Sequence, residues 1–256
     1  MGKLALGYDN QIDTSTLSGG SWNASYPLTN LQTRQFALQA RSSNALTTST
    51  KLILDCGAIQ RIGVCALVNH NLTTVATVRL EGSNNSGFSS LEYDSGALTV
   101  YDHTDYAFSF VQAEARYWRI SISDTSNPDG YIAIGRVFLG WRFQPAINIA
   151  YSPSLSVESL TVVQETLGGQ EYFDLRPNRR IWTGSWDALA DSEAYAIWLQ
   201  VQRGEDVSGE VYLIFDDADT TYRQYTNFIG RMRLLSAIEF PYQDRHTAGF
   251  EISELI

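Results

Sequence analysis

Cysteine and histidine are both scarce in this chain of 256 residues, and each scarcity excludes a kind of site. Cys56 and Cys65 are the only cysteines, too few for the disulfide framework of a small secreted domain, and no Cys/His cluster has zinc spacing. The three histidines, His70, His103 and His246, form no two-histidine metal motif. We therefore expect no metal and no cofactor.

Cys56 and Cys65 flank the segment GAIQR, and the residues on either side of it read as two short strands. As cross-strand neighbours the two thiols could form a disulfide. We favour two buried free thiols, because a free cysteine behaves as a small apolar residue.

Motifs that carry chemistry are also missing. No GxSxG elbow, P-loop or GxGxxG opens a helix after a strand, so the usual signals of hydrolases, nucleotide-binding and dinucleotide-binding proteins are absent. Among 28 acidic residues no pair stands out as the two carboxylates of a glycoside hydrolase, because their separation is a three-dimensional property. We expect a protein that is not an enzyme.

Long apolar runs are absent as well. None approaches the roughly 20 residues that span a bilayer. The start MGKLALGYDNQID has no long apolar core and no small-residue cleavage site, so we expect neither a membrane span nor a conventional secretion signal. A net charge of −10 repels phosphates, which disfavours direct nucleic-acid binding.

The acidic excess lies in one part of the chain. Residues 1–145 hold 10 Lys+Arg and 11 Asp+Glu, whereas residues 146–256 hold 8 and 17. With the length, this asymmetry predicts two domains divided near residue 145.

The first part is built from short runs of β-branched and aromatic residues between Ser/Asn/Gly/Asp clusters. Strands are expected at about 51–55, 61–69, 76–82, 97–101, 107–111, 117–123 and 133–141. In RYWRISIS polar and apolar residues alternate from Tyr117 to Ser123, so one face should point into a core and the other towards water. The pattern predicts a mainly β, jelly-roll sandwich over residues 1–145.

The second part, residues 146–256, is also expected to be mainly β. Residues 155–186 read as strands with a hairpin turn at 167–169, and strands follow at about 210–215, 222–228, 231–240 and 247–254. Between them, apolar residues at near-helical spacing predict one helix over about 186–203, with Asp187 or Asp191 as its cap and Gly204 after its end.

A candidate carbohydrate site combines Trp22, Arg41, His70 and Asn71, which lie in polar segments or at a strand end. An indole can stack on a sugar, and the polar groups can donate and accept hydrogen bonds. The alternative is structural: asparagine side chains tie a turn to its backbone while His70 packs or caps.

Two further groups of charged residues have a functional and a structural interpretation. Arg116 and Arg119 stand on a sheet face, where they either support the sheet or contact a ligand. Asp216, Asp217 and Asp219 offer oxygen ligands for calcium, but the glycine and distant glutamate of an EF-hand loop are missing, so we favour a solvated hairpin turn.

Residues 26–140 resemble the discoidin (coagulation factor 5/8 type C) domain, a galactose-binding-like jelly roll. The matching segments are YPLTNL, KLILDCGAIQRIGVCALVNHN, VRLEGSNN and the closing ARYWRISISD with IAIGRVFLG. The chain departs from the family in lacking the outer cysteine pair and in having GSNNSGFSS at the usual DG-containing turn. The resemblance implies a discoidin-like fold and loops that bind sugar or lipid, with host-surface glycans as one partner.

Residues 146–256 look like minor tail proteins of tailed bacteriophages, on the segments WTGSWDALADSEAYAIWLQVQRG, VYLIFDD, RQYTNFIGRMR and FEISEL. This part is similar to the tube-like β fold of distal tail proteins, which form rings between tail tube and tail tip. The resemblance implies a structural protein of the virion, made in the bacterial host cytoplasm, with the tail tube and the tail hub or tip proteins as partners.

A ring needs a heterologous interface between copies. We expect the ring to be a trimer or a hexamer. The candidate interface sets Arg223, Arg231 and Arg233 against the acidic residues Asp216, Asp217 and Asp219 of an adjacent copy; intramolecular pairing is the alternative. We therefore predict a ring-forming tail-tip protein, with a stand-alone, lectin-like carbohydrate-binding protein as the alternative.

Overall fold

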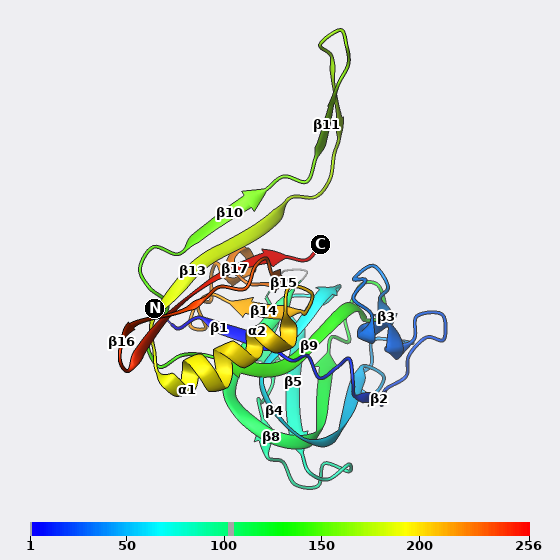
Figure 1. Cartoon of the computed structure of the whole chain (residues 1–256). Helices are drawn as coiled ribbons and strands as arrows, with labels where there is room; N and C mark the ends of the chain where they lie inside the picture. Colours follow the sequence, from blue (N-terminus) through cyan, green and yellow to red (C-terminus); the bar gives the residue numbers. More distant parts are fainter. Residues whose placement is uncertain (1, 102–104) are drawn as a thin grey trace.

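The computed structural model describes residues 2–101 and 105–256 of the chain. The described chain is mainly β, with 47% of residues in strands and a single long helical segment. Most strands pair antiparallel in one continuous sheet, in the order β10-β13-β17-β15-β14-β1-β9-β4-β8-β5-β6 (Figure 1). The mainly β class expected from the sequence is confirmed.

The elements of the jelly-roll half lie together below and to the right of the helix in Figure 1. They are β2 (Thr16–Ser18), the 3-10 helix η1 (Leu28–Gln32), β3 (Ala40–Arg41), β4 (Lys51–His70), β5 (Thr77–Ser83), β6 (Tyr93–Asp94), β7 (Leu98–Thr99), β8 (Tyr106–Ser123) and β9 (Ala133–Phe143).

The other half contains the remaining strands and the helices. They are β1 (Ala5–Tyr8), β10 (Ser154–Glu158), β11 (Val162–Glu165), β12 (Glu171–Asp174), β13 (Arg179–Leu189), α1 (Asp191–Glu193), the π-helical turn η2 (Ala194–Trp198), α2 (Leu199–Glu205), β14 (Val211–Ile214), α3 (Arg223–Thr226), β15 (Phe228–Met232), β16 (Ile238–Tyr242) and β17 (Arg245–Glu254).

Strand β8 has the alternation that its sequence predicts. Trp118, Ile120 and Ile122 are buried in the jelly-roll core, while Arg119 and Ser121 between them are partly exposed. Because side chains alternate across a strand, the polar residues share the outer face. This face carries the candidate site described below.

Strand β4 runs unbroken through GAIQR, so the expectation of two short strands around that segment is wrong. A register shift between Asp55 and Gln60 relative to β8 absorbs extra residues as a bulge, and Gly57 takes a positive φ of 73° there. Cys56 and Cys65 consequently lie on one strand and are free thiols, with Cys65 buried and Cys56 half-buried.

The short strand β1 joins the two halves. It pairs with β9 on one side and with β14 on the other, and Leu4 and Leu6 belong to the core of the second half. The predicted division at residue 145 stays a prediction, although separate core clusters do form in the jelly roll and around the helix.

The helix begins later than predicted. Residues 186–189 continue strand β13, and the helical segment runs from Asp191 to Glu205. The reason is tertiary: Trp186 is buried in the core and pairs with Ala248 of β17, which holds the backbone extended. The capping carboxylate also differs from both candidates, because Glu193 accepts the backbone N–H of Ala190.

One predicted strand is partly helical. Within residues 222–228, α3 forms a helical turn that ends at Asn227, and β15 begins at Phe228. Asn227 accepts a hydrogen bond from the backbone N–H of Phe215 and so ties this turn to the end of β14.

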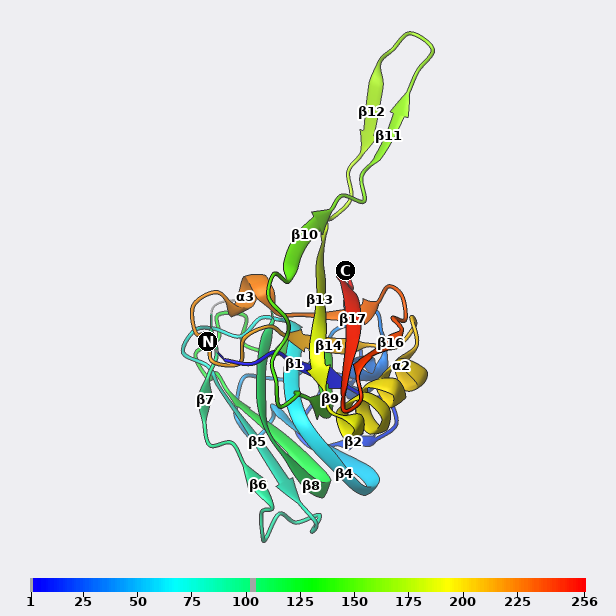
Figure 2. The same cartoon turned by 60° about the vertical axis from the view of Figure 1, so that its left-hand side comes forward.

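The hairpin β11–β12 is predicted correctly and projects away from the body (Figures 1 and 2). The paired strands β10 and β13 lead into it, so the four strands form one long ribbon. Three residues, 159–161, separate the pairs on one side and four, 175–178, on the other, which is a one-residue irregularity in register. At the tip, Gly169 takes a φ of 78°.

Candidate functional site

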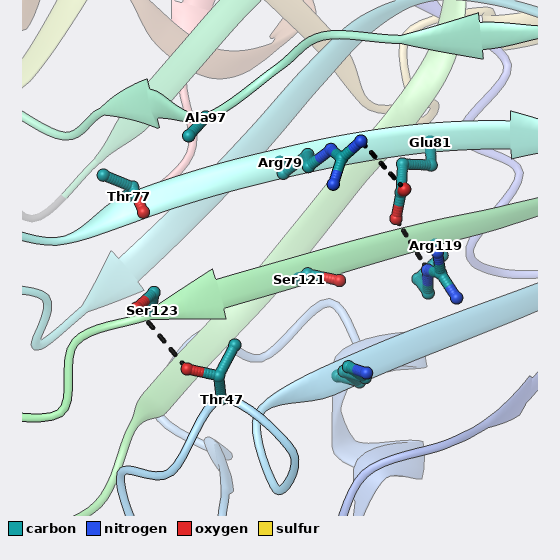
Figure 3. A pocket seen from close by; sticks show the side chains of 9 residues that line it. Thr47, Thr77, Arg79, Glu81, Ala97, Arg119, Ser121 and Ser123 are labelled. Carbon is teal, nitrogen blue, oxygen red and sulfur yellow. Dashed lines mark hydrogen bonds and ion pairs between the residues drawn. The ribbon is translucent and has the colours of Figure 1, made fainter.

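A groove lined by polar side chains crosses the outer face of three neighbouring strands of the jelly roll. We call it the polar groove and define it by Lys51, Arg79, Glu81, Arg119 and Ser121 (Figure 3). Its remaining lining residues are Thr47, Thr77, Ala97 and Ser123, and its volume is about 280 Å³.

Strand pairing places these residues side by side. Ser121 of β8 lies opposite Lys51 of β4 and opposite Arg79 of β5. Two residues further along β8 and β5, and so on the same face, Arg119 lies opposite Glu81. Because directly opposed residues share a face, β4, β8 and β5 present a continuous polar surface.

Glu81 is the buried centre of the charge network. Its side chain is 5% exposed and accepts a hydrogen bond of 2.7 Å from Nε of Arg119. Nη2 of Arg79 lies 3.4 Å from its other oxygen. The Arg119 guanidinium also stacks over Phe88, 4.3 Å from the ring centroid. Figure 3 shows Glu81 between the two arginines.

Arg79 is fixed on its other side by Asp94. Nε and Nη2 of Arg79 donate to the two carboxylate oxygens at 2.8 and 2.6 Å. These hydrogen bonds lower the pKa of Asp94 to about 2 and raise the pKa of Arg79. With Asp94, which lies beside the groove and not in its lining, three cations (Lys51, Arg79 and Arg119) face two carboxylates.

Several polar atoms of the groove keep hydrogen-bonding capacity for a ligand. Within the described chain, no hydrogen bond of this structure engages Nζ of Lys51, Oγ of Ser121 or Oγ1 of Thr77. Their strands are paired on both sides, so these groups stand on a rigid surface. A rigid row of free donors and acceptors suits a ligand that is itself polar along its length.

The sequence identified only part of this groove. Arg119 and Ser121 lie in the alternating segment, and ligand contact was one interpretation of Arg119. Arg116, the other arginine considered there, pairs with Asp55 at 2.8 and 2.9 Å outside the groove and supports the bulge of β4. Lys51 and Arg79 were missed, because only the pairing of distant strands brings them beside Ser121.

Three of the four residues of the predicted carbohydrate site lie beside one segment of β9, because Arg41 pairs with Ala133, Asn71 accepts the N–H of Ala133 and His70 pairs with Ile134. Trp22 bridges to Ser42, next to Arg41, and donates its indole N–H to the carbonyls of Gly19 and Lys51. The Arg41 guanidinium stacks on Tyr26, 4.0 Å from the ring centroid.

The side chains of His70 and Asn71 form hydrogen bonds with backbone groups nearby. His70 is 7% exposed, and its Nδ1 accepts the backbone N–H of Leu72. Asn71 accepts the N–H of Ala133 and donates to Asp129 and to the carbonyl of Tyr131. These contacts agree with the structural interpretation, and carbohydrate binding by the set stays a prediction.

The acidic residues of the predicted interface are engaged within the chain. Asp216 accepts the backbone N–H of Gly2, and Asp217 accepts that of Lys3. Asp219 accepts the N–H groups of Thr221 and Tyr222, hydrogen bonds that lower its pKa. In the described part of the chain no group of three or more His, Cys, Asp or Glu residues could hold a metal ion.

The basic residues of that interface have separate environments. Arg223 lies over the ring of Tyr101, and Arg231 donates to the carbonyl of Val207. Arg233 forms ion pairs with Glu251 and Glu158. The interface between copies stays a prediction.

Of the other histidines, His246 is buried and bonds through Nε2 to Asp191 at 2.7 Å, while His103 lies outside the described residues. No helix among the described residues is long and apolar enough to cross a membrane.

The chain matches no family model and no curated protein. Solved structures similar to it include a fucose-binding module of Streptococcus pneumoniae (10% identity, TM-score 0.43), the lectin domain of lectinolysin bound to Lewis B antigen (13%, 0.43), and a CBM32 module of a family 31 glycoside hydrolase from Clostridium perfringens (13%, 0.41). Each match covers 52% of this chain, and 95%, 96% and 98% of the respective module.

These neighbours are named as lectin, fucose-binding or CBM32 modules. At such identities and TM-scores they carry no argument about what this protein binds. Nothing in the comparisons supports a tail-tip identity. The residues of the polar groove are therefore the basis for the proposed function.

Proposed function

We propose that the protein binds carbohydrate in the polar groove and performs no chemistry on it. The observation that carries the proposal is the row Lys51–Ser121–Arg79, set across three paired strands with polar atoms free for a ligand. A sugar hydroxyl both donates and accepts, so it matches neighbouring ammonium, hydroxyl and guanidinium groups. The excess of one positive charge favours a glycan that carries carboxylate or sulfate groups.

A glycan array followed by titration calorimetry on the best ligand tests this proposal. Lys51→Ala removes a charged hydrogen bond and should weaken binding by about 10-fold or more, and Ser121→Ala by about 5-fold. Arg61→Ala and Ser109→Ala are the controls, because they remove a similar group from the same two strands outside the groove. A folded protein that binds no glycan on the array would contradict the proposal.

The loop-end residues provide an internal comparison. If the site predicted around Arg41 binds the sugar instead, Arg41→Ala should abolish binding while Lys51→Ala leaves it unchanged. If the polar groove binds it, the two variants should behave in the opposite way. The same calorimetric experiment therefore distinguishes two carbohydrate sites.

A second candidate function is that of a ring-forming structural protein in a bacteriophage tail tip, joining the tube to hub or tip proteins. The observation that favours it is the long ribbon that ends in β11–β12, because a projecting β element offers an attachment to neighbouring subunits. Mass spectrometry of purified tail particles tests it. A chain found only outside particles would argue against this function.

A further inference from the structure

A second hollow lies between the last turns of the helix and the strands β1 and β9. It consists of a cavity of about 380 Å³ and a neighbouring one of about 210 Å³, which share Asp9, Gly204 and Glu205 in their lining. We call the two together the acidic cleft and define it by these three residues with Tyr8, Trp141 and Glu210. None of its lining residues belongs to the polar groove. Its size suits a small-molecule ligand.

Two aromatic rings form one wall of the acidic cleft. Tyr8 of β1 lies opposite Trp141 of β9, and the ring centroids are 5.9 Å apart. Both side chains are half-buried and so remain partly accessible. The helix supplies the facing wall with Ala196, Gln200 and Gly204, which are spaced four residues apart and therefore share one helix face. An aromatic face attracts a cation that approaches within about 6 Å of the ring.

Gly204 keeps the cleft open at its centre. It lies inside α2, which ends at Glu205, although glycine destabilises a helix interior relative to alanine. Its φ is not positive, and a Cβ atom at this position would meet no heavy atom of another element within 4 Å. Neither the backbone conformation nor packing therefore requires glycine here. A longer side chain would instead fill space that both cavities share.

The acidic cleft carries an excess of negative charge. Four carboxylates line it, those of Asp9, Asp13, Glu205 and Glu210. Against them stand Arg34 in the lining and the buried Arg136, which pairs with Asp13 and Glu210. The charged neighbours outside the lining cancel, since Arg61 pairs with Glu114 and the end of the helix carries both Arg203 and Asp206. Two carboxylates are therefore left without a compensating cation.

Two carboxylate oxygens of the cleft also lack hydrogen-bond donors. Glu210 is 2% exposed, and its Oε1 accepts no hydrogen bond within the described chain, because Arg34 lies 3.8 Å away and donates elsewhere. Oε1 of Glu205 accepts the backbone N–H of Asp9 at 2.6 Å, but no donor of the described chain reaches its Oε2. Burial, with the charges of Asp9 and Glu210, raises the pKa of Glu205. A buried carboxylate without a donor indicates a binding partner that supplies one.

We propose that the acidic cleft binds a small aliphatic amine, with an ammonium group on Glu205 and Asp9 and the carbon chain against Tyr8 and Trp141. An ammonium group donates hydrogen bonds to carboxylates, compensates their charge and is attracted to the aromatic wall. A neutral sugar would leave the excess charge in place. A bare metal ion fits less well, because the described chain has no group of three His, Cys, Asp or Glu residues that could hold it. The proposal does not depend on glycan binding in the polar groove.

Titration calorimetry with spermidine and with 1,5-diaminopentane tests the ligand class. The wild type should bind at least one of the two amines with a Kd below about 1 mM. The controls are 1,5-pentanediol, which has the same length without charge, and magnesium chloride, which supplies a hydrated divalent cation. Neither should bind measurably. Absence of amine binding, or equal binding of the diol or of magnesium, would overturn the proposal.

Three variants identify the site. Glu205→Gln removes the charge but keeps an oxygen for the N–H of Asp9, and it should weaken amine binding by about 10-fold or more. Asp206→Asn is the matched control, because it makes the same charge change at the next residue, which is exposed and outside the lining, and it should leave binding unchanged.

Gly204→Leu should abolish amine binding by filling the cleft. Since leucine favours a helix over glycine, the melting temperature of this variant should be at least that of the wild type, which shows that it is folded. Equal losses in Glu205→Gln and Asp206→Asn would mean unspecific attraction of a cation. Unchanged binding in Glu205→Gln or in Gly204→Leu would place the amine elsewhere, and each of these outcomes would contradict the assignment.

Discussion

Arg136 of β9 forms a buried ion pair that connects the jelly-roll half to the second half. Its side chain is fully buried, and its Nε and Nη2 lie 3.0 and 2.6 Å from Oε2 of Glu210, which is 2% exposed. Nη2 also lies 2.6 Å from Asp13, and Nη1 donates to the carbonyl of Leu31. Arg136 therefore holds three segments together from one position.

Arg136→Met should lower the free energy of unfolding by about 3–5 kcal/mol, because it leaves the Glu210 carboxylate buried without a cation. Arg34, whose Nε lies 3.8 Å from Glu210 and is largely exposed, replaces little of that interaction. Glu210→Gln should cost less, because Arg136 keeps Asp13 and the Leu31 carbonyl. The double variant should cost less than the sum of the two, by about 1–3 kcal/mol of coupling.

Urea unfolding followed by tryptophan fluorescence measures these differences. The matched control is Arg61→Met, because Arg61 and Glu114 form a pair of the same 2.6 Å distance in which both side chains are more than half exposed. A surface pair of this kind should cost at most about 1 kcal/mol. If Arg136→Met cost no more than Arg61→Met, burial would not be what gives the pair its strength, and the reasoning would be refuted.

Three further predictions concern pH, thiol reactivity and the hairpin. The folded pKa of Asp94 is lowered to about 2, so its stabilising effect is complete above about pH 4 and is lost as pH falls towards 2; Asp94→Asn should flatten the melting temperature over that interval. Burial raises the pKa of both thiols, and a thiol reagent should label Cys65 only after unfolding and Cys56 slowly; rapid labelling of both in the native protein would contradict this. Replacing residues 159–178 by Asn-Gly should change the unfolding free energy of the monomer by less than about 1 kcal/mol, because the hairpin adds nothing to the described core, and a larger loss in urea unfolding would show contacts with the body.

Local patterns predicted much of the fold. The alternation in β8 and the turn at Gly169 depend on neighbours in sequence, so period and turn chemistry were sufficient to predict them. The start of the helix was wrong, because the extended backbone at Trp186 is imposed by pairing with β17, some sixty residues later. The bulge in β4 was missed for the same reason, because it depends on the register of β4 against its partner strand β8.

The candidate site was predictable only in part for the same reason. Arg119 and Ser121 stand out in the alternating segment, whereas Lys51 and Arg79 are seventy and forty-two residues from Ser121. Their opposition across β8 follows from the order β4-β8-β5, which no local pattern encodes. Arg41, His70 and Asn71 of the predicted set do lie beside the same segment of β9, although His70 and Asn71 form hydrogen bonds with the local backbone.

The position of β1 has a consequence for how the protein is made. The strand Ala5–Tyr8 leaves the ribosome long before one of its partners, β14 (Val211–Ile214), which is synthesised some two hundred residues later. Until then Leu4 and Leu6 have no finished core to enter, so the nascent chain exposes them, together with the edge of β1 that pairs with β14 in the finished protein. Such long-range closure slows folding. The chain should therefore depend on chaperones until its last quarter emerges, and truncation before residue 211 should produce aggregates rather than a soluble jelly roll.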